Sequence, residues 1–270
     1  MIQFNFNRFG KVAKWSLTND RSYYLRSFLQ VLVILTLIFL GFTTQFFSFK
    51  INGETRVYDS CASIAMIIFL VNLIAGPSLM FQSMKGKHDR QTLLMLPASN
   101  FEKYIMRYST WIILMPLYVI AFFGADLIQY LVNVLGGNEN VMFVTTKLID
   151  NVSDTMKHLW ATERKFMLTD FFVAMVWLHS VYALGGTFFR SHKYAILLTT
   201  VAIIVYGLLH VWLFGKGSSS DEINPSDKTD IIWCISYGIL IIVNYWLSYR
   251  LFCRNQVIGK FVNLYELFIV

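Results

Sequence analysis

Four polar residues lie inside long apolar stretches of this sequence, where a side chain capable of chemistry is unusual. They are Asn72, Asp126, His179 and Asn244. Within a membrane-crossing helix, an amide, a carboxylate or an imidazole marks either a path for substrate or ions, or a hydrogen bond between packed helices. The four residues are therefore candidates for lining a translocation path, with helix packing as the alternative for each.

A second constellation lies between two apolar stretches, in a basic segment. Ser99 and Glu102 are three residues apart, the spacing of a capping box in which each side chain accepts a hydrogen bond from the other residue's backbone N–H. Pro97 disfavours helical geometry at the residue before it. The pattern predicts a short apolar helix over 90–96, a sharp break, and a new helix that begins at Ser99. A turn of this kind suits the docking of another protein.

No motif for catalysis, metal binding or cofactor binding accompanies these residues. Gly86-Lys87 is followed by His88 and lacks the glycine-rich loop that cradles phosphates, and no metal-ligand spacing occurs. We therefore expect neither an enzyme nor a bound cofactor. Cys61 and Cys234 would lie near the outer ends of two helices and could form a bridge, but two buried apolar cysteines are the favoured interpretation.

The composition shows which elements position these residues. Of 270 residues, 56% are hydrophobic and 14% are charged, whereas soluble domains carry about 25% charged residues. Six runs lack charged residues, and each reaches the roughly 17–25 residues that a membrane-crossing helix needs. The fold class that we predict is an all-α integral membrane protein with six transmembrane helices, in a single domain over 1–270. The runs are 27–49, 60–84, 108–125, 171–189, 194–215 and 231–249.

The excess of positive charge follows the membrane. Lys and Arg gather in the arm 1–26, the loop 82–107, the turn 190–193 and the tail 254–270, and the alternate loops are balanced or acidic. Because Lys and Arg accumulate on the cytoplasmic side of membrane proteins, both termini are predicted to be cytoplasmic. The charge is thus not expected to bind nucleic acid.

Two amphipathic helices are expected outside the spans. Near the N-terminus, Phe6, Phe9, Ala13 and Leu17 recur at helical spacing with basic residues around them, which is typical of a helix lying on the lipid bilayer. The segment 136–170 begins with the helix stop signal Gly136-Gly137 and is predicted to be external. Its helix has one apolar face, formed by Val141, Val144, Leu148, Val152, Met156 and Leu159.

The stretch from Leu94 to Lys103 resembles the membrane subunits of ABC-2-type ATP-binding-cassette transporters. It is similar to the small permeases of Bacteroidota, in which an LP-x-S-x-x-E-K/R signature follows the second helix. The resemblance implies an exporter in the bacterial cytoplasmic (inner) membrane, formed with a second permease chain, identical or not, and with ATP bound on a separate ATPase subunit. The long external segment between the third and fourth helices is a departure from the family pattern. Better-known members carry their main external segment between the fifth and sixth helices. The residues that the resemblance assigns to ATPase coupling are Arg90, Leu93, Leu94, Leu96, Pro97, Ser99, Glu102 and Lys103.

Two other classes of function stay open at the level of sequence. One is a membrane scaffold or sensor module that transports nothing. An ATPase gene beside the gene of this chain would argue against that class. The other is an ion-coupled secondary transporter, for which midplane charges and inverted repeats are expected. Neither of these two features is visible in the sequence.

Overall fold

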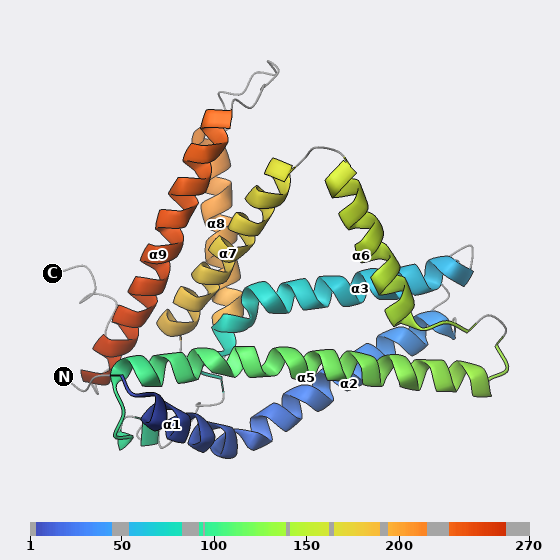
Figure 1. Ribbon diagram of the computed structural model, residues 1–270, viewed down its shortest axis with the longest axis horizontal. Coiled ribbons are helices and arrows are strands. Elements are labelled where there is room, and N and C mark those ends of the chain that lie inside the picture. The colour runs from blue at the N-terminus through green and yellow to red at the C-terminus, as the bar shows by residue number, and fades with distance from the viewer. Residues whose placement is uncertain are drawn as a thin grey trace. The chain divides into compact units, whose positions relative to one another are not determined.

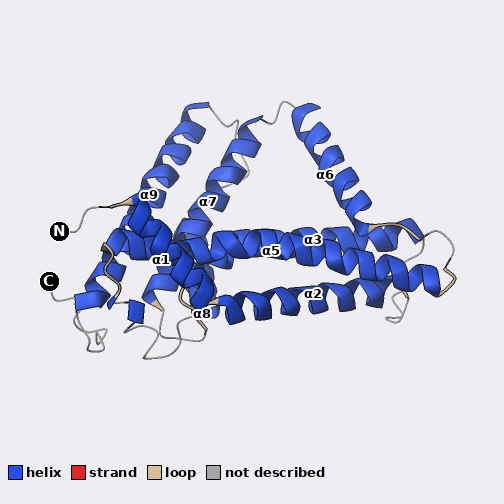
Figure 2. Ribbon diagram, turned by 60° about the horizontal axis from the view of Figure 1, so that its bottom comes forward, coloured by secondary structure: helices blue, strands red, loops and turns tan. Residues whose placement is uncertain are grey.

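The computed structural model describes residues 4–44, 54–82, 92–93, 95–138, 141–161, 165–189, 194–214 and 227–257. Every long regular element in this part of the chain is a helix (Figure 2). The contacts divide the chain into two compact units. Unit 1 comprises Met1–Ser16, Ile74–Ser109 and Asp170–Val270, and unit 2 comprises Leu17–Leu73 and Thr110–Thr169. The expectation of a single membrane domain stays a prediction.

The helices follow one another along the chain as the charge-free runs predict, with one interruption in the second run. Figure 1 labels them. They are α1 (Phe6–Asn19), α2 (Arg21–Thr43), α3 (Glu54–Ala75), the 3-10 turn η1 (Gly76–Leu79), α5 (Asn100–Leu135), α6 (Val144–Ala161), α7 (Lys165–Phe188), α8 (Ala195–Phe214) and α9 (Asp227–Val257).

Five described segments are long and apolar enough to cross a membrane, which indicates a multi-pass membrane protein. They are Arg21–Thr43, Arg56–Leu79, Asn100–Leu135, Phe171–Phe188 and Cys234–Arg254. A sixth apolar segment, Ala195–Leu209 in α8, is shorter. The all-helical membrane class is thus confirmed with five candidate spans, and the sixth span stays a prediction.

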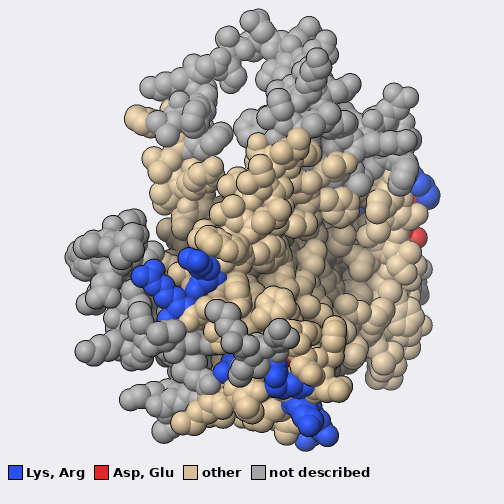
Figure 3. Space-filling model, turned by 60° about the vertical axis from the view of Figure 1, so that its left-hand side comes forward, with Lys and Arg blue, Asp and Glu red and all other residues tan. Residues whose placement is uncertain are grey.

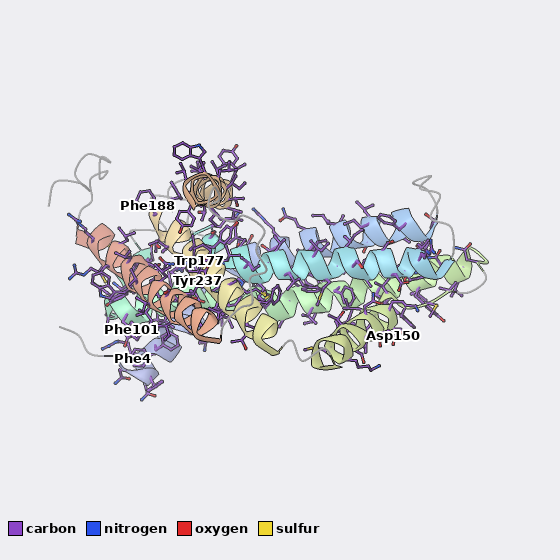
Figure 4. All side chains as sticks on the ribbon, turned by 90° about the horizontal axis from the view of Figure 1, so that it is seen from above. Phe4, Phe101, Asp150, Trp177, Phe188 and Tyr237 are labelled. Atoms are coloured by element: carbon purple, nitrogen blue, oxygen red, sulfur yellow. The ribbon has the colours of Figure 1, made fainter. Side chains whose placement is uncertain are left out.

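In unit 2, α2, α3 and the second half of α5 lie side by side (Figures 1 and 4). Their core holds Phe39 and Phe122, whose ring centroids are 5.9 Å apart, beside the fully buried Ala62 and Ala65. Small residues let apolar helices approach closely where lipid offers no hydrophobic driving force. Cys61 is a buried free thiol in the same cluster.

The end of α5 confirms the predicted stop at Gly136-Gly137. Gly137 has a positive φ of 72°, a conformation that glycine adopts without steric cost. The N–H of Asn138 donates to the carbonyl of Asn133 at 3.1 Å, and the N–H of Gly137 donates to that of Val134 at 3.1 Å. These two bonds form a Schellman motif, which satisfies carbonyls that the helix end would leave without a partner.

Unit 1 is built where the N-terminal helix, the first turns of α5 and the last turns of α9 meet (Figure 1). One cluster joins Val12 of α1, Met106 of α5, Ala183 of α7 and Phe252 of α9. The elements therefore meet through side chains that are far apart in the sequence.

Two residues of the apolar face predicted for α1 are exposed, and the placement of this helix on a membrane stays a prediction. The residues that α1 buries are Val12 and Ser16, whereas Phe6 is 81% exposed and Leu17 is 44% exposed. The helix carries two apolar faces, and the one that packs on the protein is centred on Val12. The face with Phe6 and Leu17 is left outward, as a helix lying on a membrane requires.

Candidate functional site

The start of α5 forms the capping box that the sequence predicts. The Glu102 N–H donates to Ser99 Oγ at 3.2 Å, and the Ser99 N–H donates to Glu102 Oε2 at 2.8 Å. The box satisfies two backbone donors that the first turn would leave without a partner. We call the described residues 92–93 and 95–107 the elbow.

Glu102 also anchors the N-terminal segment. Its carboxylate accepts bonds from the Asn5 N–H at 2.8 Å and from Arg8 Nε and Nη2 at 2.8 and 2.7 Å. The Glu102 side chain is fully buried, and the hydrogen bonds from Arg8 raise the pKa of that guanidinium. A buried carboxylate is tolerated because charged and backbone donors surround it. The elbow is thus fastened to the segment that leads into α1.

The coupling residues that the resemblance names occupy different environments. Leu93 is buried and Leu96 is half-buried, both within the hydrophobic cluster of unit 1. Lys103 is 5% exposed, and Pro97 is exposed. Between the two leucines, Met95 is 83% exposed. Thr92, Leu93 and Met95 are helical, as expected for part of the short helix over 90–96, whereas Arg90 and Leu94 lie outside the described residues.

Aromatic rings continue the outward face of the elbow. Phe101 is 46% exposed, and its ring centroid lies 5.9 Å from that of Phe4. The ring centroids of Phe4 and Phe6 are 4.9 Å apart. Figure 4 labels Phe4 and Phe101 beside each other. On its inner side Phe101 lies 5.9 Å from Tyr249 of α9. The rings run from the surface of unit 1 to its core.

Basic residues gather on the same end of unit 1. Lys11 and Lys14 of α1 and Arg250 and Arg254 of α9 are exposed. In Figure 3, blue Lys and Arg groups lie on the face turned to the viewer, and among the residues that the structure describes little red lies between them. This face fits anionic partners, such as lipid headgroups or acidic side chains.

Gly186 of α7 packs against the break that ends α3. A Cβ atom at Gly186 would lie 2.8 Å from the Cα of Ser78 and 2.9 Å from the carbonyl of Pro77. Ser78 Oγ donates to the carbonyl of Tyr182 at 3.0 Å. The Gly76-Pro77 kink is therefore a packing feature, and it leads the chain from α3 toward the elbow.

A ladder of polar side chains joins α5, α7 and α9 above the elbow. In its first rung Ser248 Oγ lies 2.9 Å from the Tyr104 hydroxyl and 2.7 Å from Thr187 Oγ1, and it also lies 3.2 Å from the carbonyl of Ala183. In membrane proteins such bonds join helices that lipid would otherwise separate. We call this set, with the next rungs, the polar ladder.

Two of the four path candidates belong to the next rungs. The Tyr108 hydroxyl is hydrogen-bonded to His179 Nε2 and lies 3.3 Å from the Tyr245 hydroxyl. Beside them, Asn244 Nδ2 donates to Ser180 Oγ at 3.0 Å. The structure therefore brings His179 and Asn244 together in unit 1.

The other two candidates are in unit 2 and have separate partners. The Asp126 carboxylate accepts bonds from the N–H groups of Val144 and Thr145 at 2.8 and 2.9 Å, which are the first residues of α6. The carbonyl of Asn72 accepts a bond from Trp111 Nε1 at 3.2 Å. Asp126 acts as an N-terminal cap on a helix that follows it in the chain.

Several contributors were missed in the sequence. Arg8 lies in the basic arm 1–26, and Tyr108, Tyr245 and Ser248 lie in the charge-free runs 108–125 and 231–249, so that no motif marks them. A signal was present, because Tyr104 and Tyr108 are four residues apart and Tyr245 and Ser248 are three apart. These spacings place hydroxyl groups on one helix face.

Within the described part of the chain, no group of three or more His, Cys, Asp or Glu side chains is arranged to hold a metal ion. A comparison of the chain with protein-family models, with curated proteins and with solved structures finds no match.

Proposed function

We propose that this chain is the membrane-spanning subunit of an ABC transporter and that a separate ATPase subunit docks on the elbow. The observation that carries the proposal is the setting of Met95. This side chain is 83% exposed and lies outside the candidate spans, between two leucines that pack on the protein's own core. A large apolar side chain presented on a firm support is typical of a docking surface.

The support behind Met95 suits the transmission of force. The capping box fixes the start of α5, and Glu102 fastens that start to the segment before α1. The 36-residue α5 extends about 54 Å at 1.5 Å per residue. Movement of an ATPase against the elbow would therefore reach the span directly, as alternating access in a transporter requires.

The polar ladder has a defined role in this proposal. It joins α7 and α9 to the first turns of α5 through hydroxyl, imidazole and amide groups. Each bond of this kind contributes about 0.6 kcal/mol in membrane bundles, so individual rungs break and reform at small cost. His179 and Asn244 remain candidates for lining a path that opens when the ladder rearranges.

The orientation of the chain follows from the basic residues of unit 1. Exposed lysines and arginines of α1 and α9 lie at the end that carries the elbow, and such residues accumulate on the cytoplasmic side. In the proposed arrangement both termini are cytoplasmic, six helices cross the inner membrane, and the chain works with a second permease chain. Export is the direction that the family resemblance favours.

Co-purification with a candidate ABC ATPase subunit that lacks membrane spans tests the proposal. The two proteins are co-expressed, and the membrane chain is isolated in detergent. ATP hydrolysis by the ATPase is then measured in liposomes that contain the membrane chain and in liposomes that lack it. A stable complex with altered ATP hydrolysis is the expected result. If no complex forms and the ATPase is unaffected, a scaffold or sensor that transports nothing becomes the better assignment.

A further inference from the structure

A hollow on the surface of unit 2 lies between the end of α2 and the start of α3. It has a volume of about 570 Å³. The proposed function does not use it, and it contains none of the residues that the sequence singled out. Its lining comprises Phe42 of α2 and Arg56, Asp59, Ser60, Ser63 and Ile64 of α3.

Opposite charges stand next to each other in this hollow without pairing. Arg56 and Asp59 are one turn apart on α3, yet within the described part of the chain neither forms an ion pair. The Ser60 hydroxyl donates to the carbonyl of Arg56 at 2.9 Å, and the Ser63 hydroxyl is exposed. A cation and an anion that do not engage each other match a ligand that carries both charges.

The same face of α3 changes from polar to apolar along the helix. Ile67 and Val71, one and two turns beyond Ser63, are 59% and 57% exposed. At 1.5 Å per residue, the polar part from Arg56 to Ser63 extends about 10 Å, and the apolar part to Val71 extends about 12 Å. These lengths are close to a headgroup layer and to most of one leaflet of a hydrocarbon core of about 30 Å. The face therefore has the polarity profile of a single phospholipid.

We infer that the hollow binds the headgroup of a zwitterionic phospholipid of the phosphatidylethanolamine type. The lipid phosphate contacts Arg56, and its primary ammonium donates to Asp59. The ester groups lie at the level of Ser60 and Ser63. The acyl chain follows Ile67 and Val71. The inference requires that α3 crosses a membrane and is independent of the ATPase.

The two charged residues predict an order of preference among lipids. Phosphatidylethanolamine satisfies both charges through hydrogen bonds. Phosphatidylcholine carries a quaternary ammonium, which has no N–H to donate to Asp59. Phosphatidylglycerol has no cation and leaves that carboxylate facing an anion, an unfavourable arrangement. Binding should therefore weaken in this order.

Native mass spectrometry of the purified full-length chain, titrated with each of the three lipids, measures the preference. Arg56→Gln should weaken binding of all three lipids roughly tenfold, as expected for the loss of one charge-assisted contact. Asp59→Asn should abolish the preference for phosphatidylethanolamine over phosphatidylglycerol. Ser63→Leu should fill the hollow and weaken all three. Asp154→Asn, which removes an exposed carboxylate of α6, is the matched control and should change nothing.

Three results would overturn the inference. Equal binding of the three lipids by the original chain would show that the charges play no part. Competition by soluble glycerophosphoethanolamine as strong as by the lipid would assign the hollow to a free phosphate compound. A change of oligomeric state in Ser63→Leu, with lipid binding retained, would assign it to a second copy of the chain. Melting temperatures identify any misfolded variant, and Ser63→Val, which also adds apolar volume to the hollow, then serves in place of Ser63→Leu.

Discussion

Glu102 holds the elbow in place through a number of bonds that is unusual for one side chain. Its carboxylate accepts from two backbone N–H groups, of Asn5 and Ser99, and from two nitrogens of Arg8. The bidentate guanidinium contact fixes direction as well as charge. Because the side chain is fully buried, water cannot replace a donor that is lost.

Substitutions around this carboxylate should therefore lower the stability of the chain by different amounts, in a fixed order. Arg8→Ala leaves the Glu102 carboxylate without its counter-charge and should have the largest cost in stability of the three substitutions. Arg8→Lys keeps the charge but loses the fork, so its cost should be smaller. Ser99→Ala removes one cap and should cost about 1 kcal/mol. Thermal unfolding of the detergent-purified variants measures the order, and equal melting temperatures for all three would contradict the role of Glu102.

Asp126, a candidate for the translocation path, accepts hydrogen bonds from the first N–H groups of α6, and a structural role for this residue can be tested. Asp126→Ala removes the acceptor for the first N–H groups of α6 and should cost about 1–3 kcal/mol, while Asp126→Asn, which keeps one acceptor oxygen, should cost less. Transport per folded molecule should be unchanged in both. Loss of transport at an unchanged melting temperature would instead place Asp126 on a substrate path.

The capping box could be predicted and the Arg8 contact could not, for a physical reason. Ser99 and Glu102 interact across one helical turn, so their types and spacing suffice. Arg8 lies 94 positions from Glu102 in the sequence, and only the packing of α1 on the core brings them together. The same holds for His179 and Tyr108, which are 71 positions apart.

At the scale of helices, local sequence signals predict where a helix begins and ends better than which of its faces is buried. The predicted extent of α5, from the capping box to Leu135, agrees with the structure because Ser99 begins the helix and Gly137 ends it. The buried face of α1 was not predicted, since its apolar residues surround much of the helix. Pro116 lies inside α5 without ending the helix. A membrane helix tolerates such a residue where neighbours satisfy the freed carbonyl.

The contact between η1 and α7 gives a prediction at this scale. Gly186→Ala places a methyl group against the backbone of Ser78 and Pro77, which cannot move aside cheaply, so the variant should be destabilised by about 1–3 kcal/mol. Gly207→Ala and Gly238→Ala are matched controls, because a Cβ atom at either position meets nothing within 4 Å. These controls should be neutral or stabilised by up to about 1 kcal/mol. A Gly186→Ala variant as stable as the controls would show that Gly186 and η1 are not closely packed.

At the scale of the whole chain, the orientation in the membrane is the first prediction. Lys14 of α1 and Asp154 of α6 are both exposed, and the proposed topology places them on opposite sides. In intact cells, a membrane-impermeant thiol reagent should label Asp154→Cys and should reach Lys14→Cys only after the membrane is opened. The endogenous cysteines are first replaced by alanine. Labelling of both positions in intact cells, or the reverse pattern, would reject the topology.

Docking of an ATPase on the elbow is the central claim, and Met95 gives its most direct measurement. Leu96→Asp would disturb the core of unit 1, whereas Met95 is 83% exposed and can be changed without loss of packing. Met156→Asp, at a 44% exposed methionine of α6, is the matched control. We predict that Met95→Asp weakens co-purification of the ATPase at least about tenfold, the effect of losing a hot-spot side chain, while Met156→Asp retains it. Full ATPase binding and coupled ATP hydrolysis by a folded Met95→Asp chain would contradict the assignment of the elbow.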